Sequence, residues 1–130
     1  MKRIGILLIL CFMLTGCAKK EPPPAHRVVV GVQVEYRHSS QLLHRTYTRP
    51  ENIEAILNYL RILKPFGPVV PEESNGNGCR ITLRYSHGPD TVYLQQGNAY
   101  LSRDNGDWAT IDSTRASLLY PLLLLLPSDA

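Results

Sequence analysis

Apolar and polar residues alternate most regularly over positions 79–86. Odd positions there carry Cys, Ile, Leu and Tyr, and even positions carry Arg, Thr, Arg and Ser. A period of two predicts a β-strand with one buried and one solvated face. Shorter runs, separated by turn residues such as Gly, Asn and Asp, predict further strands over 91–96, 99–102 and 108–111. Together these segments predict an antiparallel meander.

A β-branched stretch from Val28 to Arg37 predicts another strand. Its second half alternates, with Val32, Val34 and Tyr36 on one side and polar residues on the other. A polar turn over 38–41 leads to a return strand over 42–47, where the alternation is poor. The two segments predict a hairpin.

The clearest helix is predicted to begin after Thr48. Thr48 and Glu51 have the spacing of a capping box, and Pro50 suits the first turn of a helix. Pro65 ends the helix near Lys64, because proline disfavours helical geometry in the residue before it. Between these signals, apolar residues recur at helical spacing and form one stripe: Ile53, Ile56, Leu57, Leu60 and Leu63.

The remaining segments complete an α+β domain. Residues 66–78, rich in Pro, Gly and Asn, predict a long loop. Asp112 or Ser113 caps a second helix, which Pro121 kinks or restarts. The leucines at 122–126 are too few to span a membrane, which takes about 20 apolar residues. They either pack on the sheet or form an exposed apolar tail that touches a bilayer or a partner, and the last three residues are predicted to fray.

The predicted fold class is therefore α+β. It consists of an antiparallel sheet of about four to six strands, with one helix packed on a face and a C-terminal helix.

The start of the chain has a different pattern. Lys2 and Arg3 precede an uncharged run of 11 residues that ends at Leu14, which suits the apolar core of a signal peptide. The segment Leu14-Thr15-Gly16-Cys17 resembles the lipobox of bacterial lipoprotein signal peptides: an aliphatic residue, a small residue, Gly or Ala, and Cys. The resemblance implies cleavage after Gly16 and a diacylglyceryl group on the Cys17 sulfur. An ordinary secretory signal is the alternative.

This resemblance divides the chain into a signal peptide (1–16), a lipidated Cys17 with a proline-rich tether (17–27) and one folded domain (28–130). Three consecutive prolines at 22–24 favour an extended tether, and ten such residues reach about 30 Å. The arrangement resembles small lipoproteins with an extracytoplasmic α+β domain. The protein is expected on the extracytoplasmic face of the cell membrane, held to the bilayer through Cys17.

Charge and cysteine content narrow the possible partners. The net charge is +3, but cleavage removes Lys2 and Arg3 and leaves 12 basic residues against 11 acidic ones. That balance gives no reason to expect nucleic acid as a partner.

Cleavage also removes Cys11, so with Cys17 lipidated only Cys79 is left and no intrachain disulfide can form. Cys79 is either a small apolar strand residue or the site of an intermolecular disulfide.

No catalytic, metal or cofactor site is predicted. The chain lacks a Gly-x-Ser-x-Gly nucleophile elbow and a His-Glu-x-x-His zinc helix. Its histidines do not have metal-ligand spacing. Glu72 and Glu73, in the predicted loop, are interpreted as solvated charges. Residues 104–107 resemble part of a calcium loop but lack its later glutamate, and Asn105-Gly106 fits a hairpin turn better.

A candidate binding surface is predicted on the solvated side of the meander. Guanidinium groups beside tyrosines bind carboxylates, phosphates or sugar rings. The alternative is that long amphipathic side chains only cover the sheet. If the apolar side of the strands faces the helices, the other side carries Arg80, Arg84, Tyr93, Gln95 and Tyr100.

These features favour a membrane-anchored interaction or accessory module for a membrane or envelope protein. A small-ligand-binding or inhibitor-type domain is the alternative, and an enzyme has the least support. A deep apolar pocket with convergent polar groups would favour ligand binding. A flat exposed sheet face or an apolar C-terminal patch would favour a protein partner.

Overall fold

The computed structural model describes residues 27–72 and 77–129. The predicted signal peptide, the predicted lipidation site Cys17 and the tether up to position 26 lie outside these residues, as does Ala130. Among the described residues, no helix is long and apolar enough to cross a membrane.

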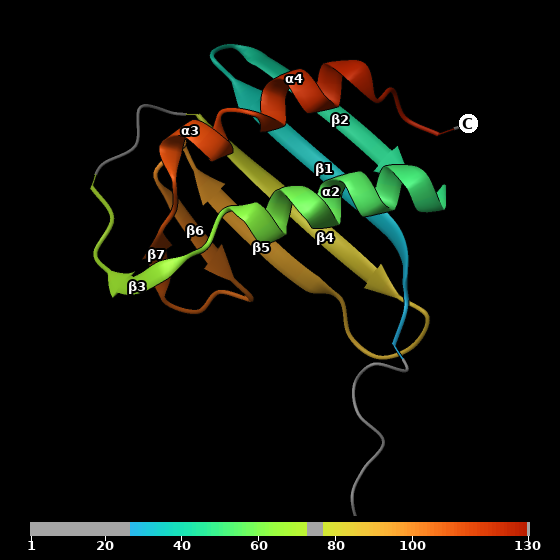
Figure 1. The fold of residues 1–130 in the computed structure, drawn as a ribbon, viewed down its shortest axis with the longest axis horizontal. Coiled ribbons are helices and arrows are strands. Elements are labelled where there is room, and N and C mark those ends of the chain that lie inside the picture. Colours follow the sequence, from blue (N-terminus) through green and yellow to red (C-terminus); the bar gives the residue numbers. More distant parts are fainter. Residues whose placement is uncertain (1–26, 73–76, 130) are drawn as a thin grey trace, which may run out of the picture.

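The fold is α+β, as predicted, and is built on one antiparallel sheet of seven strands (Figure 1). The strands lie in the order β2-β1-β4-β5-β6-β7-β3. Strands β4 to β7 pair in sequence and form the predicted meander, while β1 pairs with both β2 and β4. The strands are β1 (Val29–His38), β2 (Gln41–Tyr47), β3 (Phe66–Val69), β4 (Gly78–Tyr85), β5 (Thr91–Gln96), β6 (Tyr100–Arg103) and β7 (Trp108–Thr110).

Strand β3 lies within the segment predicted to be a loop. It pairs with β7 at the edge of the sheet, where Phe66 is opposite Thr110 and Val69 is opposite Trp108. The Gly-Pro pair inside this strand argues against a strand when only the sequence is considered, because proline has no backbone N–H to donate to a neighbouring strand. An edge strand tolerates proline, since one side of its backbone needs no partner strand. The sheet therefore has one strand more than the predicted range.

The helices lie together on one face of the sheet (Figure 1). They are α2 (Pro50–Ile62), α3 (Ser113–Ala116) and α4 (Leu119–Leu125). Asp112 caps α3, as predicted, by accepting a hydrogen bond from the Arg115 backbone N at 3.1 Å. Pro121 lies in the first turn of α4, where its missing N–H is no loss, so the second predicted helix restarts as a separate one.

The core fills the space between the helices and the sheet. It combines apolar residues from β1 and β4 with the inner sides of α2 and α4: Val32, Val34, Ile53, Ile56, Ile81, Leu83, Leu119 and Leu123. The leucine run is partly packed and partly exposed, and no contact of its exposed part with a bilayer or a partner is tested. Leu123 is fully buried, whereas Leu124 and Leu125 are 56% and 77% exposed.

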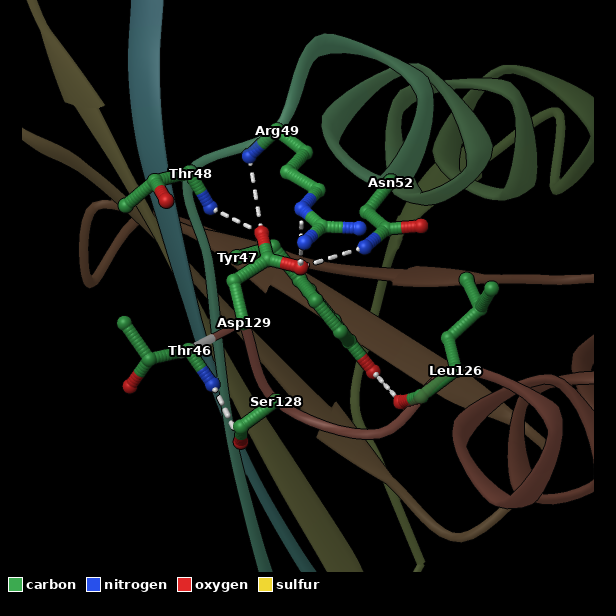
Figure 2. Close-up of polar contacts among 8 residues, drawn as sticks. All are labelled: Thr46, Tyr47, Thr48, Arg49, Asn52, Leu126, Ser128 and Asp129. Carbon is green, nitrogen blue, oxygen red and sulfur yellow. Dashed lines mark hydrogen bonds and ion pairs between the residues drawn. The ribbon is translucent and has the colours of Figure 1, made fainter.

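The C-terminal tail is held against β2 (Figure 2). The Asp129 backbone N donates to Thr46 O at 2.9 Å, and the Thr46 backbone N donates to Ser128 Oγ at 3.0 Å. The Tyr47 hydroxyl donates to Leu126 O at 2.6 Å. The predicted fraying is therefore wrong for Ser128 and Asp129. By pairing with Thr46, the tail occupies part of the outer edge of β2, which would otherwise be open to other strands.

Asp129 also caps α2, in place of the predicted capping box. Its Oδ2 accepts hydrogen bonds from the backbone N of Thr48 at 2.6 Å and of Arg49 at 2.7 Å, and its Oδ1 accepts one from Asn52 Nδ2 at 2.6 Å (Figure 2). Arg49, rather than Thr48, stands at the N-cap position, and its side chain makes no cap hydrogen bond. The start of the helix is thus satisfied by a carboxylate from the end of the chain, where negative charge also suits the helix dipole.

Candidate functional site

The face of the sheet opposite the helices is the candidate site, and we call it the open face. No helix in the described ranges covers it (Figure 1). Residues directly opposite each other in antiparallel strands point to the same side, so the register identifies its side chains. One row crosses six strands through His44, Glu35, Arg80, Leu94, Ser102 and Trp108. The neighbouring row runs through Leu42, Arg37, Gly78, Gln96, Tyr100 and Thr110.

Arg80, Arg84 and Tyr100 lie on the open face, as predicted. Arg80 and Tyr100 belong to the two rows, and Arg84 lies further along β4. Tyr93 and Gln95 point to the helix side instead, because they are paired with the core residues Ile81 and Cys79. The predicted placement of Tyr93 and Gln95 on the solvated side is therefore wrong.

Gln95 is buried because the helix side supplies partners for its amide. The Tyr59 hydroxyl of α2 donates to Gln95 Oε1 at 2.5 Å, and Gln95 Nε2 donates to Gly97 O at 2.9 Å. With both polar atoms satisfied, Gln95 is only 3% exposed. Val92 and Leu94 consequently face the open side, although their apolar character favours the core.

Tyr59→Phe should destabilise the domain by about 1–3 kcal/mol, because Gln95 Oε1 would be buried without its donor. Urea unfolding followed by circular dichroism measures the change. Adding Gln95→Met should recover part of the loss, since it removes the unsatisfied acceptor. Equal stability of Tyr59→Phe and the wild type would contradict this explanation of why a glutamine lies in the core.

A groove of about 390 Å³ crosses the open face between the two rows. Gly78 has no side chain between Arg37 and Gln96 on the neighbouring strands, so the surface is low at this point. Charged and apolar side chains from five strands form the walls: Glu35, Arg37, Leu42, Arg80, Leu94 and Trp108.

Sequence reasoning missed Arg37, Leu94 and Trp108 as members of this site. The alternation in β1 did place Arg37 on the polar side of its strand. The pairing of β1 with β4, which brings Arg37 close to Arg80, has no signal in the local pattern because α2 and β3 separate the two strands in sequence.

Arg37, Arg80 and Arg84 give the open face an excess of positive charge. Within the described chain, none of the three forms a hydrogen bond or an ion pair with another residue. Glu35 is paired with His44, whose Nε2 lies 3.3 Å from the Glu35 carboxylate. Free guanidinium groups bind carboxylates or phosphates and stay protonated, so they recognise anions rather than transfer protons.

The guanidinium group of Arg84 lies next to Gly31, near the start of β1. A Cβ atom on Gly31 would be 2.8 Å from Arg84 Nη2, so the glycine leaves the space that the guanidinium group occupies. Arg84 is therefore on the same face as the groove but outside its walls.

Cys79 lies on the helix side of β4 and is 7% exposed. Burial raises the pKa of its thiol, which makes the sulfur a poor nucleophile. This agrees with the interpretation of Cys79 as a small apolar strand residue. Over residues 27–72 and 77–129, no three His, Cys, Asp or Glu side chains gather closely enough to hold a metal ion.

Comparison of the chain with protein-family models, with curated proteins and with solved structures finds no match.

Proposed function

We propose that this protein is a lipid-anchored interaction module on the extracytoplasmic face of the cell membrane, and that its open face binds a membrane or envelope protein. The observation that carries the proposal is a broad sheet face, free of described helices, on which Arg37 and Arg80 line a groove and have no partner among the described residues. The lipobox-like segment from Leu14 to Cys17 supports the location.

The residue types on the open face support a protein as the partner. Trp, Tyr and Arg contribute most of the binding energy at protein interfaces. Trp108 and Tyr100 lie on the neighbouring strands β7 and β6, and Arg80 lies in the same row as Trp108. Six strands spaced about 4.8 Å apart span roughly 25 Å, which is wide enough for an interface of ordinary size.

A small-ligand-binding domain is the second candidate, favoured by the groove volume of about 390 Å³. Ligand sites, however, enclose most of the surface of their ligand. This groove is formed by the side chains of one sheet face, so a bound small molecule would keep one side exposed to water. A protein surface, which covers the whole face, fits the geometry better.

Photo-crosslinking in intact cells tests the proposal. A photoreactive amino acid at Gln33 or Thr110, both exposed on the open face, should form a discrete adduct with a membrane or envelope protein. The matched control position is Asn58, which is exposed on α2 and therefore lies on the other side of the molecule.

Adducts that form from Gln33 and Thr110 but not from Asn58 support the proposal. Adducts that form only from Asn58, or equally from all three positions, contradict it, because the partner would then not contact the open face selectively.

A further inference from the structure

We infer that the groove on the open face binds an extended acidic segment of a partner protein, with carboxylates two residues apart and an apolar side chain four residues further on. This inference deepens the proposed function and rests on it. It names the chemistry of the segment that the interaction module recognises.

The charges of the open face select an anionic segment. Arg37 and Arg80 wall the groove without partners among the described residues, and these two cations outnumber Glu35, the single carboxylate beside them, whose oxygen lies 3.3 Å from His44 Nε2. A guanidinium group binds a carboxylate with two parallel hydrogen bonds, which gives direction as well as attraction. A segment with two carboxylates would therefore satisfy both arginines.

The positions of the two arginines set the spacing of the carboxylates. Arg37 on β1 is opposite Gly78 on β4, and Arg80 follows Gly78 by two residues, so the arginines are diagonal neighbours. Diagonal neighbours across two strands lie about 7–8 Å apart. In an extended chain, side chains at i and i+2 point to the same side and are separated by about 7 Å. The two spacings match.

Beyond Arg80, the groove becomes apolar. Leu94 is directly opposite Arg80, and Trp108 lies two strands further in the same row, with the small residue Ser102 between them. Three strand spacings of about 4.8 Å place Trp108 about 14 Å from Arg80, which corresponds to about four residues of extended chain. An apolar side chain four residues after the second carboxylate would reach the indole ring.

Two observations favour a protein segment over a lipid headgroup or a glycan. The chain enters β1 at Val29, and Arg37 stands near the far end of this strand, about 25 Å from the point where the tether joins the domain. The groove is therefore remote from the end of the sheet that a tether would hold close to the bilayer. Its walls also include Leu42 and Leu94, which suit apolar peptide side chains better than sugar hydroxyls.

Trp108 provides a direct readout, because it is the only tryptophan in the chain and it lines the groove. The probe is the peptide acetyl-Gly-Glu-Ser-Glu-Ser-Ser-Ser-Phe-Gly-amide, added to the full chain purified with its membrane anchor in a neutral detergent. The peptide should change Trp108 fluorescence saturably, and salt should weaken its binding. The same peptide with both glutamates replaced by glutamine should bind at least about tenfold more weakly.

Arg80→Glu should weaken binding of the acidic peptide by about tenfold or more, because it replaces attraction with repulsion at one carboxylate. Arg84→Glu is the matched control: it makes the same change of charge on the same strand and face. Arg84 lies four residues from Arg80, about 13 Å along the strand, which exceeds the screening length of about 8 Å at physiological ionic strength. We expect Arg84→Glu to change the affinity by less than about twofold, and both variants to keep the wild-type melting temperature.

Three results would overturn the inference: no difference between the acidic and the glutamine peptide, equal weakening by the two charge reversals, or a Trp108 response to anionic vesicles or heparin but not to the peptide. If crosslinking from Gln33 and Thr110 succeeds while the peptide fails, the proposed function survives and only the acidic segment is excluded. If crosslinking also fails at those positions, the proposed function fails with it.

Discussion

Replacing Asp129 with alanine is expected to lower the melting temperature of the domain by several degrees. The carboxylate accepts hydrogen bonds from the backbone N of Thr48 and Arg49 and from the Asn52 side chain. Its side chain is only 5% exposed, so water cannot readily take its place. The variant would leave the start of α2 without a cap, since Arg49 at the N-cap position provides no side-chain hydrogen bond. Thermal unfolding followed by circular dichroism measures the loss.

Asp107→Ala is the matched control, because it removes an exposed carboxylate that has no interaction with another residue of the described chain. It should melt close to the wild type. If Asp129→Ala also melts with the wild type, the Asp129 carboxylate does not stabilise the start of α2.

The contribution of Asp129 should depend on pH in one direction. Hydrogen bonds from the Arg49 backbone above all, and then from Thr48 and Asn52, hold the pKa of Asp129 below its ordinary value despite the opposing effect of burial. A carboxyl group whose pKa is lowered by folding stabilises the fold at pH values above its unfolded pKa, about 3.9 for Asp. The stability difference between the wild type and Asp129→Asn should therefore stay constant near neutral pH and shrink as the pH falls below about 4. A difference that grows in acid would contradict this assignment.

Cys17→Ala is expected to abolish both lipidation and cleavage after Gly16, because the implied modification forms on the Cys17 sulfur. The wild-type protein should begin at Cys17 and carry the mass of a diacylglyceryl group. It should be recovered from cell membranes, because two acyl chains give stable anchoring. The variant should retain residues 1–16 and carry no acyl mass. Intact-mass spectrometry of the detergent-extracted protein distinguishes these forms.

Cys11→Ala is the control for this experiment, because it removes the other cysteine near the start of the chain and should leave processing unchanged. A wild-type chain that keeps residues 1–16 and has no acyl group would show that the lipobox resemblance is misleading. The open face would then have to be considered without a membrane anchor.

Much of the fold could be predicted from local patterns, because alternation and helical spacing depend on neighbouring residues. The alternation at Cys79, Ile81, Leu83 and Tyr85 correctly identified the buried side of β4. Local patterns failed where distant residues decide the outcome. Gln95 is buried because the Tyr59 hydroxyl donates a hydrogen bond to its side chain. Asp129 is held in place because its carboxylate accepts hydrogen bonds from the backbone N of Thr48 and Arg49 at the start of α2.

The candidate site could be predicted only in part for the same reason. Arg80 and Arg84 were found because they alternate with apolar residues within one strand. Arg37 and Trp108 join them only through the order of strands in the sheet, which a single sequence does not specify. The two faces of β5 are opposite to the prediction. Val92 and Leu94 therefore lie on the open face, and Tyr93 and Gln95 lie on the helix side.

Hydroxyl-radical footprinting of the protein in intact cells, compared with the purified full chain, tests most directly whether the face opposite the helices is the contact surface. Leu125, which is 77% exposed on α4, provides an internal reference on the helix side. We predict that Trp108 and Leu94 are oxidised less in cells than in the purified protein, while oxidation of Leu125 is the same in both. Equal oxidation of Trp108 in the two samples, or protection of Leu125 instead, would contradict the account.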